Sequence, residues 1–460
     1  MVSHETRQNM GSIKALNINV TLAYYILIVF SPLSWISLTG VGDSSIKLVH
    51  LSLLPLIISC LFTTYQKAII RFVTFNKYII SFFLLLMLMN FVSLAVDTNI
   101  DSFSKSMTYI IKNLSYLSLA LFFGGMMIVF IDSPGFIKNL SISNALCVII
   151  FITVASITFK ATGGNFLLDL FRFFFSGDID GLRRELYKTI FITGNTNEDA
   201  EMQVNLINSL TGSFIIVHFI SLYAFNNTKN KIFAFLNIFS FCFSLFFVIS
   251  SISRSNIFAL LFGYAIYWGC EIIFNKNTKK IFQLFATSLV VLSLTLIFWS
   301  KIQTALVDTS DMYAERFGGL DDNIRWSLNA EAIQTFTATP LNFIFGKGSG
   351  AELPSGHAVH NFIIGSAYQA GIFGLILSVL FYAGLIFSVI KYAPDIKNQK
   401  AAFIISALMS IPVLRMMESG DAGSLTLQEW FCVAIFIGFV IKKKSLAKDN
   451  LAGQAALIST

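Results

Sequence analysis

Long apolar stretches separated by short polar segments dominate the chain. A helix that crosses a bilayer needs about 20 mostly apolar residues, and windows of this kind occur about 12 times along the sequence. We expect membrane helices at 19–38, 47–64, 78–96, 107–131, 136–159, 204–225, 232–250, 255–274, 281–300, 359–390, 401–417 and 425–441. The first follows a polar segment and precedes no small-residue cleavage site, so we expect a retained helix and not a signal peptide. The pattern predicts an all-α polytopic membrane protein.

The overall composition agrees with this pattern. Of the 460 residues, 55% are hydrophobic and 12% are charged, whereas soluble domains carry about 25% charged residues. The low charge also excludes intrinsic disorder. The five cysteines, from Cys60 to Cys432, all lie in apolar runs, which excludes a disulfide framework and a zinc ribbon.

The positions of the cations predict the orientation in the membrane, because cytoplasmic loops are enriched in Lys and Arg. Alternate connections carry most of them: Arg7 and Lys14; Lys67, Arg71 and Lys77; Lys229 and Lys231; Lys276, Lys279 and Lys280; Lys391, Lys397 and Lys400; and Lys442, Lys443 and Lys444. The connections of the other phase hold few. We therefore expect both termini in the cytoplasm, and we assign the net charge of +7 to topology and not to a nucleic-acid partner.

Two connections are much longer than the rest, and both are expected on the non-cytoplasmic side. They divide the chain into five membrane helices (1–159), a first loop (160–203), four helices (204–300), a second loop (301–358), and three helices with a cytoplasmic tail (359–460). Long loops on a compact protein are usually functional.

Each long loop contains a short predicted helix. The Phe-rich stretch 167–175 is too short to span and is expected to lie along the interface as an amphipathic helix. In the second loop, apolar residues recur at helical spacing after Asp321, and Pro340 ends that helix. Gly346 and Gly348 are then expected to form a flexible loop that leads to the tenth membrane helix.

The most informative motif lies at the start of that helix. His360 and Asn361 are followed by Gly371 and Gly374, a spacing that this composition produces by chance about 0.001 times per chain. On one helix the two glycines would lie on the same face and allow a neighbouring helix to approach closely. The histidine is then expected at the outer mouth of a tightly packed helix pair.

This motif resembles the signature of the O-antigen polymerase and O-antigen ligase superfamily, which follows a large periplasmic loop. Further similar elements run in the same order along the chain: Arg183 with Gly194, Ser253 with Arg254, Arg325 with Trp326, Pro340, and Gly346 with Gly348. The resemblance extends from about 160 to 391. It implies a GT-C-like membrane fold and glycan transfer from a polyprenyl diphosphate.

Such a transfer needs a base and cations that stabilise the departing diphosphate. His360, with an ordinary pKa of about 6.5, is the best candidate base, and His357 is a second candidate for a direct role or a plain loop residue. The structural alternative for His360 is a residue that caps or packs a helix end.

Guanidinium groups stay charged and match diphosphate oxygens. Arg254, Arg325 and Arg183 are the candidates for diphosphate binding, and Arg184 is a neighbouring possibility beside Arg183. Each has a plainer alternative, since boundary arginines also contact lipid phosphate or form a solvated face. Asn361, Gly371, Gly374, Gly346 and Gly348 are expected to shape the site.

Other polar residues are given structural interpretations. His218, within the sixth predicted helix, is expected to be a hydrogen-bonded bundle residue, and Arg415 to form an ion pair. Asp178 and Asp180 could hold Mg²⁺ or Mn²⁺, but their exposed acidic loop favours a solvated turn. We therefore expect no metal and no other cofactor.

The resulting hypothesis is a periplasm-facing glycosyltransferase of the bacterial inner membrane that polymerises undecaprenyl-diphosphate-linked O-antigen repeat units. Its expected partners are the lipid-linked donor and acceptor, the bilayer, and a chain-length regulator and flippase, with no nucleic acid. The alternative within the superfamily is a ligase that transfers the glycan to lipid A-core. The alternative of another class is a lipid-linked oligosaccharide flippase, a class usually marked by broken helices at the membrane midplane.

Overall fold

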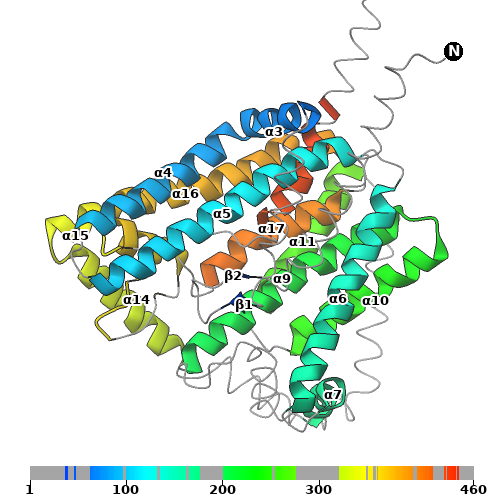
Figure 1. Ribbon diagram of the computed structural model, residues 1–460, viewed down its shortest axis with the longest axis horizontal. Coiled ribbons are helices and arrows are strands. Elements are labelled where there is room, and N and C mark those ends of the chain that lie inside the picture. Colours follow the sequence, from blue (N-terminus) through cyan, green and yellow to red (C-terminus); the bar gives the residue numbers. More distant parts are fainter. Residues whose placement is uncertain are drawn as a thin grey trace, which may run out of the picture.

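The computed structural model is mainly helical (Figure 1). It describes residues 37–39, 46–47, 63–96, 100–131, 135–161, 165–176, 200–250, 254–275, 321–348, 351–355, 359, 361–396, 401–417, 429–430, 432–441 and 443–444. The helices are α3 (Thr63–Phe75), α4 (Lys77–Val96), α5 (Ile100–Phe130), α6 (Phe136–Ala161), α7 (Phe166–Ser176), α9 (Ala200–Asn227), α10 (Lys231–Ser250), α11 (Arg254–Asn275), α14 (Asp321–Thr337), α15 (Pro340–Phe345), α16 (Phe362–Ile396) and α17 (Ala402–Met417). Among these residues, a short antiparallel pair, β1 (Ser37–Thr39) with β2 (Ile46–Lys47), is an addition to the predicted all-α class.

Several helices are long and apolar enough to cross a membrane. Within the described ranges four qualify: Phe136–Ile157, Lys231–Ser250, Ser255–Ile273 and Phe362–Pro394. A fifth counts if the bent pair Tyr65–Phe75 and Lys77–Ser93 is taken as one span. The predicted helices at 19–38, 47–64 and 281–300 lie outside the described residues, except at the edges of the first two. The coarse prediction of a helical membrane protein is confirmed, and the count of about 12 spans stays a prediction.

The distribution of side chains is the one expected in lipid. On α4, Leu88 is 54% exposed and Phe91 49% exposed, whereas Asn90 and Ser93 are fully buried. An apolar outer surface with polar residues turned inward is unfavourable in water. It is favourable in a bilayer, because lipid tails form no hydrogen bonds with an exposed amide. The exposed apolar side chains therefore mark the surface of the helices that faces lipid.

The helices form two groups that meet along their length. In Figure 1, α4 lies beside the long part of α16, and this contact is made by aromatic rings: the Phe83 and Phe381 centroids are 5.9 Å apart. Helix α5 packs against α3 and α4. In the second group, α6, α9 and α10 meet at Phe151, Phe214 and Phe247, whose ring centroids are 5.0 Å apart in each of the three pairs.

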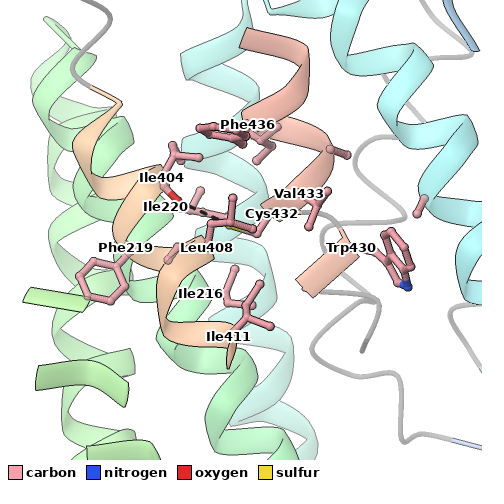
Figure 2. Close-up of a cluster of buried hydrophobic side chains, with 14 of the residues drawn as sticks. Ile216, Phe219, Ile220, Ile404, Leu408, Ile411, Trp430, Cys432, Val433 and Phe436 are labelled. Carbon is pink, nitrogen blue, oxygen red and sulfur yellow. Dashed lines mark hydrogen bonds between the residues drawn. The ribbon is translucent and has the colours of Figure 1, made fainter. Parts of the chain in front are cut away.

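A central helical segment joins the two groups. Every residue from Cys432 to Ile441 is buried, which is the pattern of a helix surrounded by others. Figure 2 shows Phe436 close to Ile220 of α9 and to Ile404 of α17, and the Cys432 thiol lies 3.7 Å from the Ile404 carbonyl oxygen. On the other side, Trp430 packs edge-on against Phe83, with the centroids 5.3 Å apart.

Hydrogen bonds between helices hold the second group together. The Asn144 amide donates to the Ser221 hydroxyl over 3.2 Å. The His218 Nε2 atom is 2.6 Å from the Tyr264 hydroxyl, and its Nδ1 atom is 3.0 Å from the Phe241 carbonyl oxygen. The prediction that His218 is a hydrogen-bonded bundle residue is confirmed.

Two short predicted helices are also found. The stretch 167–175 lies within α7, which turns Leu168 outward at 66% exposure and buries Phe166 and Leu170. Helix α14 begins at Asp321, as expected. By contrast, the expected cytoplasmic connection around Lys67 is a helix, α3, which is bent by 80° from α4 at Asn76.

Close packing of α3 against α5 depends on glycine. A Cβ atom added at Gly125 would lie 2.5 Å from the Ile69 Cγ1 atom and 3.0 Å from the Ile69 backbone nitrogen. Since a backbone atom cannot move aside cheaply, we expect Gly125→Ala to destabilise the protein by overpacking, at a cost of about 1–3 kcal/mol. Thermal unfolding in detergent should show a lower midpoint.

The matched control is Gly269→Ala on α11, where an added Cβ has nothing within 4 Å. Alanine favours a helix by up to about 1 kcal/mol over glycine, so the midpoint of this variant should equal or exceed that of the parent protein. Equal midpoints for the two variants would contradict the packing of α3 on α5.

Candidate functional site

Helix α16 reverses direction near its start. Its backbone leaves the helical region at Ala370 (φ −127°, ψ 18°) and Gly371 (φ 68°, ψ −164°). Beyond this point the Ser378 hydroxyl donates to the Ser366 hydroxyl over 2.6 Å, and the rings of Phe362 and Tyr382 lie 4.4 Å apart. In a straight helix, residues 12 positions apart would be separated by about 18 Å. The segment is therefore a helical hairpin with a short arm (362–370) and a long arm (372–396).

This reversal corrects the predicted single helix at 359–390. Gly371 lies at the turn and not on a helix face, and its positive φ suits glycine. A Cβ atom at Gly371 would overlap the backbone of Ile344, while one at Gly374 would lie 2.7 Å from the Ser366 carbonyl oxygen. The helix that approaches Gly374 is thus the short arm of the same segment, and the apolar stretch that remains for crossing is the long arm.

The break frees backbone carbonyl groups, and the preceding loop satisfies them. The Lys347 N–H donates to the Tyr368 carbonyl over 2.8 Å, and the Gly348 N–H donates to the Gln369 carbonyl over 2.9 Å. The Ser93 hydroxyl of α4 donates to the same Gln369 oxygen over 2.7 Å. Without these donors the two carbonyls would lack hydrogen-bond partners at a helix end.

Glycine is also required on the loop side of this contact. Gly346 has φ 76°, and an added Cβ atom would lie 2.5 Å from the Gln369 carbonyl carbon. The loop follows α15, where Pro340 occupies the first turn and the Thr339 hydroxyl accepts from the Asn342 N–H over 3.1 Å. Both Gly346 and Gly348 lie against the hairpin turn, and the predicted flexibility of this loop stays a prediction.

Asn361 begins the short arm. Its side-chain oxygen accepts from the Ile363 N–H over 2.9 Å and from the Ile364 N–H over 3.3 Å, which is the geometry of a helix N-cap. Because the arms are antiparallel, this end of the short arm is level with Tyr382, about 15 Å along the long arm from the turn. The expected place of Asn361 at the outer mouth of a span stays a prediction.

Helix α14 packs across the short arm. Leu328 and Ala332 of α14 form a buried cluster with Tyr368 of the short arm and with Val359 and Leu353. The connecting segment is also fixed, because the Glu331 carboxylate accepts from the Ser355 N–H over 2.8 Å and from its hydroxyl over 2.7 Å. The second long loop and the hairpin thus form one packed unit.

The predicted site residues divide into those that this unit brings together and those outside the described ranges. Asn361, Gly371, Gly374, Gly346 and Gly348 all lie in the unit. Arg325 lies in α14, one helical turn before Leu328, and Arg254 is the first residue of α11; the structure describes neither side chain. His360, His357, Arg183, Arg184, Asp178 and Asp180 lie outside the described residues.

Several polar residues of the unit were not identified from the sequence. Ser93 comes from a helix far away in the chain, and Ser366 and Ser378 are indistinguishable from other helical serines until the reversal is known. A signal was available for that pair, since small or polar residues at 366, 370, 374 and 378 are placed symmetrically about the turn. Among the described residues there is no group of three His, Cys, Asp or Glu that could hold a metal ion, and metal independence stays a prediction.

Comparison with known proteins adds no family assignment. Neither a scan against protein-family models nor a search of curated proteins found a match. The resemblance to O-antigen polymerases and ligases therefore depends on the motif residues themselves, and the structure places Asn361, Gly371, Gly374, Gly346 and Gly348 among them in the hairpin unit.

Oxidative crosslinking tests the hairpin. In the double variant Ser366→Cys/Ser378→Cys, the two thiols should form a disulfide readily, because the parent hydroxyl oxygens are 2.6 Å apart. The measurement is protection of both cysteines from alkylation after mild oxidation and denaturation, read by mass spectrometry of the peptide.

The control pair is Ser366→Cys/Val379→Cys. Val379 is adjacent in sequence but is 45% exposed on the outer face of the long arm, so this pair should remain alkylated. A straight helix would leave both pairs fully alkylated, and that result would refute the reversal at Gly371.

Proposed function

We propose that this chain is a periplasm-facing glycosyltransferase that extends lipid-linked O-antigen chains. The observation that carries the proposal is the docking of the second long loop onto the motif segment: α14, α15 and the Gly346–Gly348 loop all pack on the hairpin that begins at Asn361. The proposed mechanism needs the base of the motif segment and Arg325 of the second long loop at one catalytic centre. The direct contact between these two segments supports a shared site.

The distribution of charge supports a site on the periplasmic side. Lys77, Lys391 and Lys444 lie at one end of the antiparallel pair formed by α4 and the long arm, where Phe75 and Tyr392 meet with centroids 5.1 Å apart. The hairpin turn lies at the opposite end. Since cytoplasmic loops are enriched in lysine and arginine, the lysine end is assigned to the cytoplasm and the turn to the periplasmic side.

The exposed face of the long arm supports a substrate with a lipid tail. Phe373, Ile376 and Leu380 are each more than 40% exposed, so this face contacts the bilayer. Asn361 is half-buried and lies level with the middle of the same arm. A polyprenyl chain lying in the bilayer would contact this face of the long arm.

The proposed chemistry is an inverting displacement. His360 removes the proton from a sugar hydroxyl of the incoming repeat unit, and that oxygen attacks the anomeric carbon of the growing chain. The bond from this carbon to the diphosphate oxygen breaks, and the diphosphate leaves with the electron pair. Arg254, Arg325 and Arg183 stabilise the charge that develops on the leaving group. The proton on His360 then passes to solvent.

One observation favours the transporter class as a second candidate. Transporters commonly build their sites from interrupted helices, and α16 is interrupted at Gly371. The two functions are separable by experiment, because a flippase moves the lipid-linked oligosaccharide across proteoliposomes without lengthening it, whereas a polymerase lengthens it without a gradient.

Substitution of the proposed base and of one arginine tests the mechanism. In vitro chain extension should fall by about 100-fold or more in His360→Ala, because a general base contributes about 10²–10⁴-fold. In Arg254→Ala a loss of about 100-fold is expected from the missing leaving-group stabilisation. The charge control is Lys229→Ala, an exposed residue of the turn between α9 and α10. Parent-like rates in both site variants would eliminate the proposal.

The same variants in cells distinguish the polymerase from the ligase. Surface lipopolysaccharide capped with a single repeat unit is the expected result for a lost polymerase. Bare core together with accumulated lipid-linked polymer would assign the chain to the ligase.

The hairpin turn should matter for activity more than the helix that follows it. Gly371→Ala places a Cβ against the Ile344 backbone at a positive φ, so the loop must separate from the turn, and chain extension should drop by at least about tenfold. The control is Gly384→Ala. Gly384 lies further along the same arm, and a Cβ atom added there would meet only the Ile79 Cγ1 atom, at 3.7 Å. This control should keep its activity, and equal activities would argue against a role for the turn.

A further inference from the structure

A cluster of lysines at the end of the bundle opposite the hairpin turn has no role in the proposed reaction. It is built by three chain segments that are distant in sequence: the bend between α3 and α4, the end of α16, and the last described residues, 443–444. Figure 1 shows the red C-terminal segment beside α3. We refer to Lys77, Lys391 and Lys444 with the rings of Phe75 and Tyr392 as the basic elbow.

Aromatic rings fix the positions of the ammonium groups in the basic elbow. The Lys444 Nζ atom lies 4.3 Å from the centroid of Tyr392 and 5.3 Å from that of Phe75. The Lys391 Nζ atom lies 5.2 Å from the same Tyr392 centroid, and the Lys77 Nζ atom lies 5.0 Å from that of Tyr78. A ring face attracts a cation but is not a conventional hydrogen-bond acceptor. Each ammonium group has three N–H donors and can therefore also bind an anion.

The basic elbow is unbalanced in charge. Helices α3 and α4 contain no acidic residue between Thr63 and Val96, and the last turns of α16 contain only Asp395. The ammonium groups of Lys391 and Lys444 both lie beside the Tyr392 ring, and like charges in one region repel each other. A bound anion would relieve that repulsion.

The surroundings of the basic elbow suit a lipid and not a soluble anion. Ile70 of α3, Tyr78 of α4, and Phe387 and Ile390 of α16 are each more than 60% exposed. Tyr78 and Ile390 are next to Lys77 and Lys391 in sequence, and Phe387 lies one turn before Lys391, on helices whose outer surface faces lipid. Exposed apolar surface therefore lies directly beside the cations.

The orientation of α3 also suits a lipid headgroup at the basic elbow. Helix α3 is bent by 80° from α4, so it runs across the end of the bundle while α4 runs along it. It buries Tyr65, Ala68 and Phe72 on one side and exposes Lys67 and Ile70 on the other. A helix placed in this way lies in the plane of the headgroups, with its exposed cation among them.

We infer that the basic elbow is a binding site for an anionic glycerophospholipid. The lysine ammonium groups bind the phosphate oxygens, and the exposed side chains of Tyr78, Phe387 and Ile390 contact the acyl chains. Basic sites between membrane helices on the cytoplasmic side bind such headgroups. Because three segments supply cations, a lipid with two phosphates, cardiolipin, is the expected occupant. The inference requires a membrane protein but does not depend on the proposed glycosyl transfer.

Native mass spectrometry of the full-length protein in detergent tests this site. Titration with tetraoleoyl cardiolipin should give saturable binding, and dioleoylphosphatidylcholine should give none at the same concentrations. In the triple variant Lys77→Gln/Lys391→Gln/Lys444→Gln, the affinity for cardiolipin should fall by at least about tenfold. The reason is that each lysine near a phosphate contributes to the free energy of lipid binding. Lys444→Arg keeps the charge and should retain binding.

The charge-matched control is Lys138→Gln/Lys229→Gln/Lys231→Gln. It removes three exposed lysines from other connections predicted on the same side and should change cardiolipin binding by less than about twofold. Thermal unfolding without added lipid verifies that both triple variants fold. An equal loss in the two variants would reduce the effect to general surface charge, and stronger binding of undecaprenyl phosphate than of cardiolipin would identify a different ligand. Either outcome would overturn the inference.

Discussion

The arrangement of the segment from Asn361 to Gly374 depends on two backbone carbonyl groups, those of Tyr368 and Gln369. Both need hydrogen-bond donors where the helix breaks. In an apolar environment a carbonyl without a donor costs several kcal/mol, so a helix can break there only where other groups replace the lost hydrogen bonds. The Lys347 and Gly348 N–H groups and the Ser93 hydroxyl do so. The second long loop and α4 are thereby tied to the hairpin turn, which cannot form independently of either.

Elsewhere the bundle is held by packing with a few interhelical hydrogen bonds. Asn144 with Ser221 and His218 with Tyr264 connect α6, α9 and α11, and contacts of this type contribute modestly, at about 0.6 kcal/mol each on average in a bilayer. Aromatic clusters and glycine contacts such as Gly125 with Ile69 supply most of the complementarity. Among the described helices, backbone groups from separate segments bond directly at the hairpin turn, so that region is the most specific part of the helical bundle.

Sequence patterns predicted much of this architecture because apolar length and lysine placement are properties of single segments. Helices α4, α6, α10 and α11 fall where hydrophobic windows placed them, and α14 begins at the predicted Asp321. The reversal at Gly371 was missed because the stretch from Phe362 onward is uniformly apolar, and hydropathy does not distinguish one long helix from two antiparallel arms. Likewise Lys67 and Arg71 give α3 the charge of a connection, so the sequence predicts a loop there and not a helix. The contribution of Ser93 depends on a contact across 276 positions of sequence, which no local pattern records.

The reversal gives a physical meaning to the nine residues between Asn361 and Gly371. They are the whole of the short arm, so their number fixes both its length and the direction in which its first residues face. One residue more or less would shift Asn361 by about 1.5 Å and rotate it by about 100° relative to Ser366 and Ser378. A fixed spacing is therefore expected wherever a residue at the start of the arm must meet a partner outside it. Leu328 of α14, packed with Val359 and Tyr368, ties such a partner to the arm, because Arg325 lies one turn earlier on the same helix. The motif is thus better understood as an arm of fixed length between the Gly371 turn and Asn361 than as a face for helix packing.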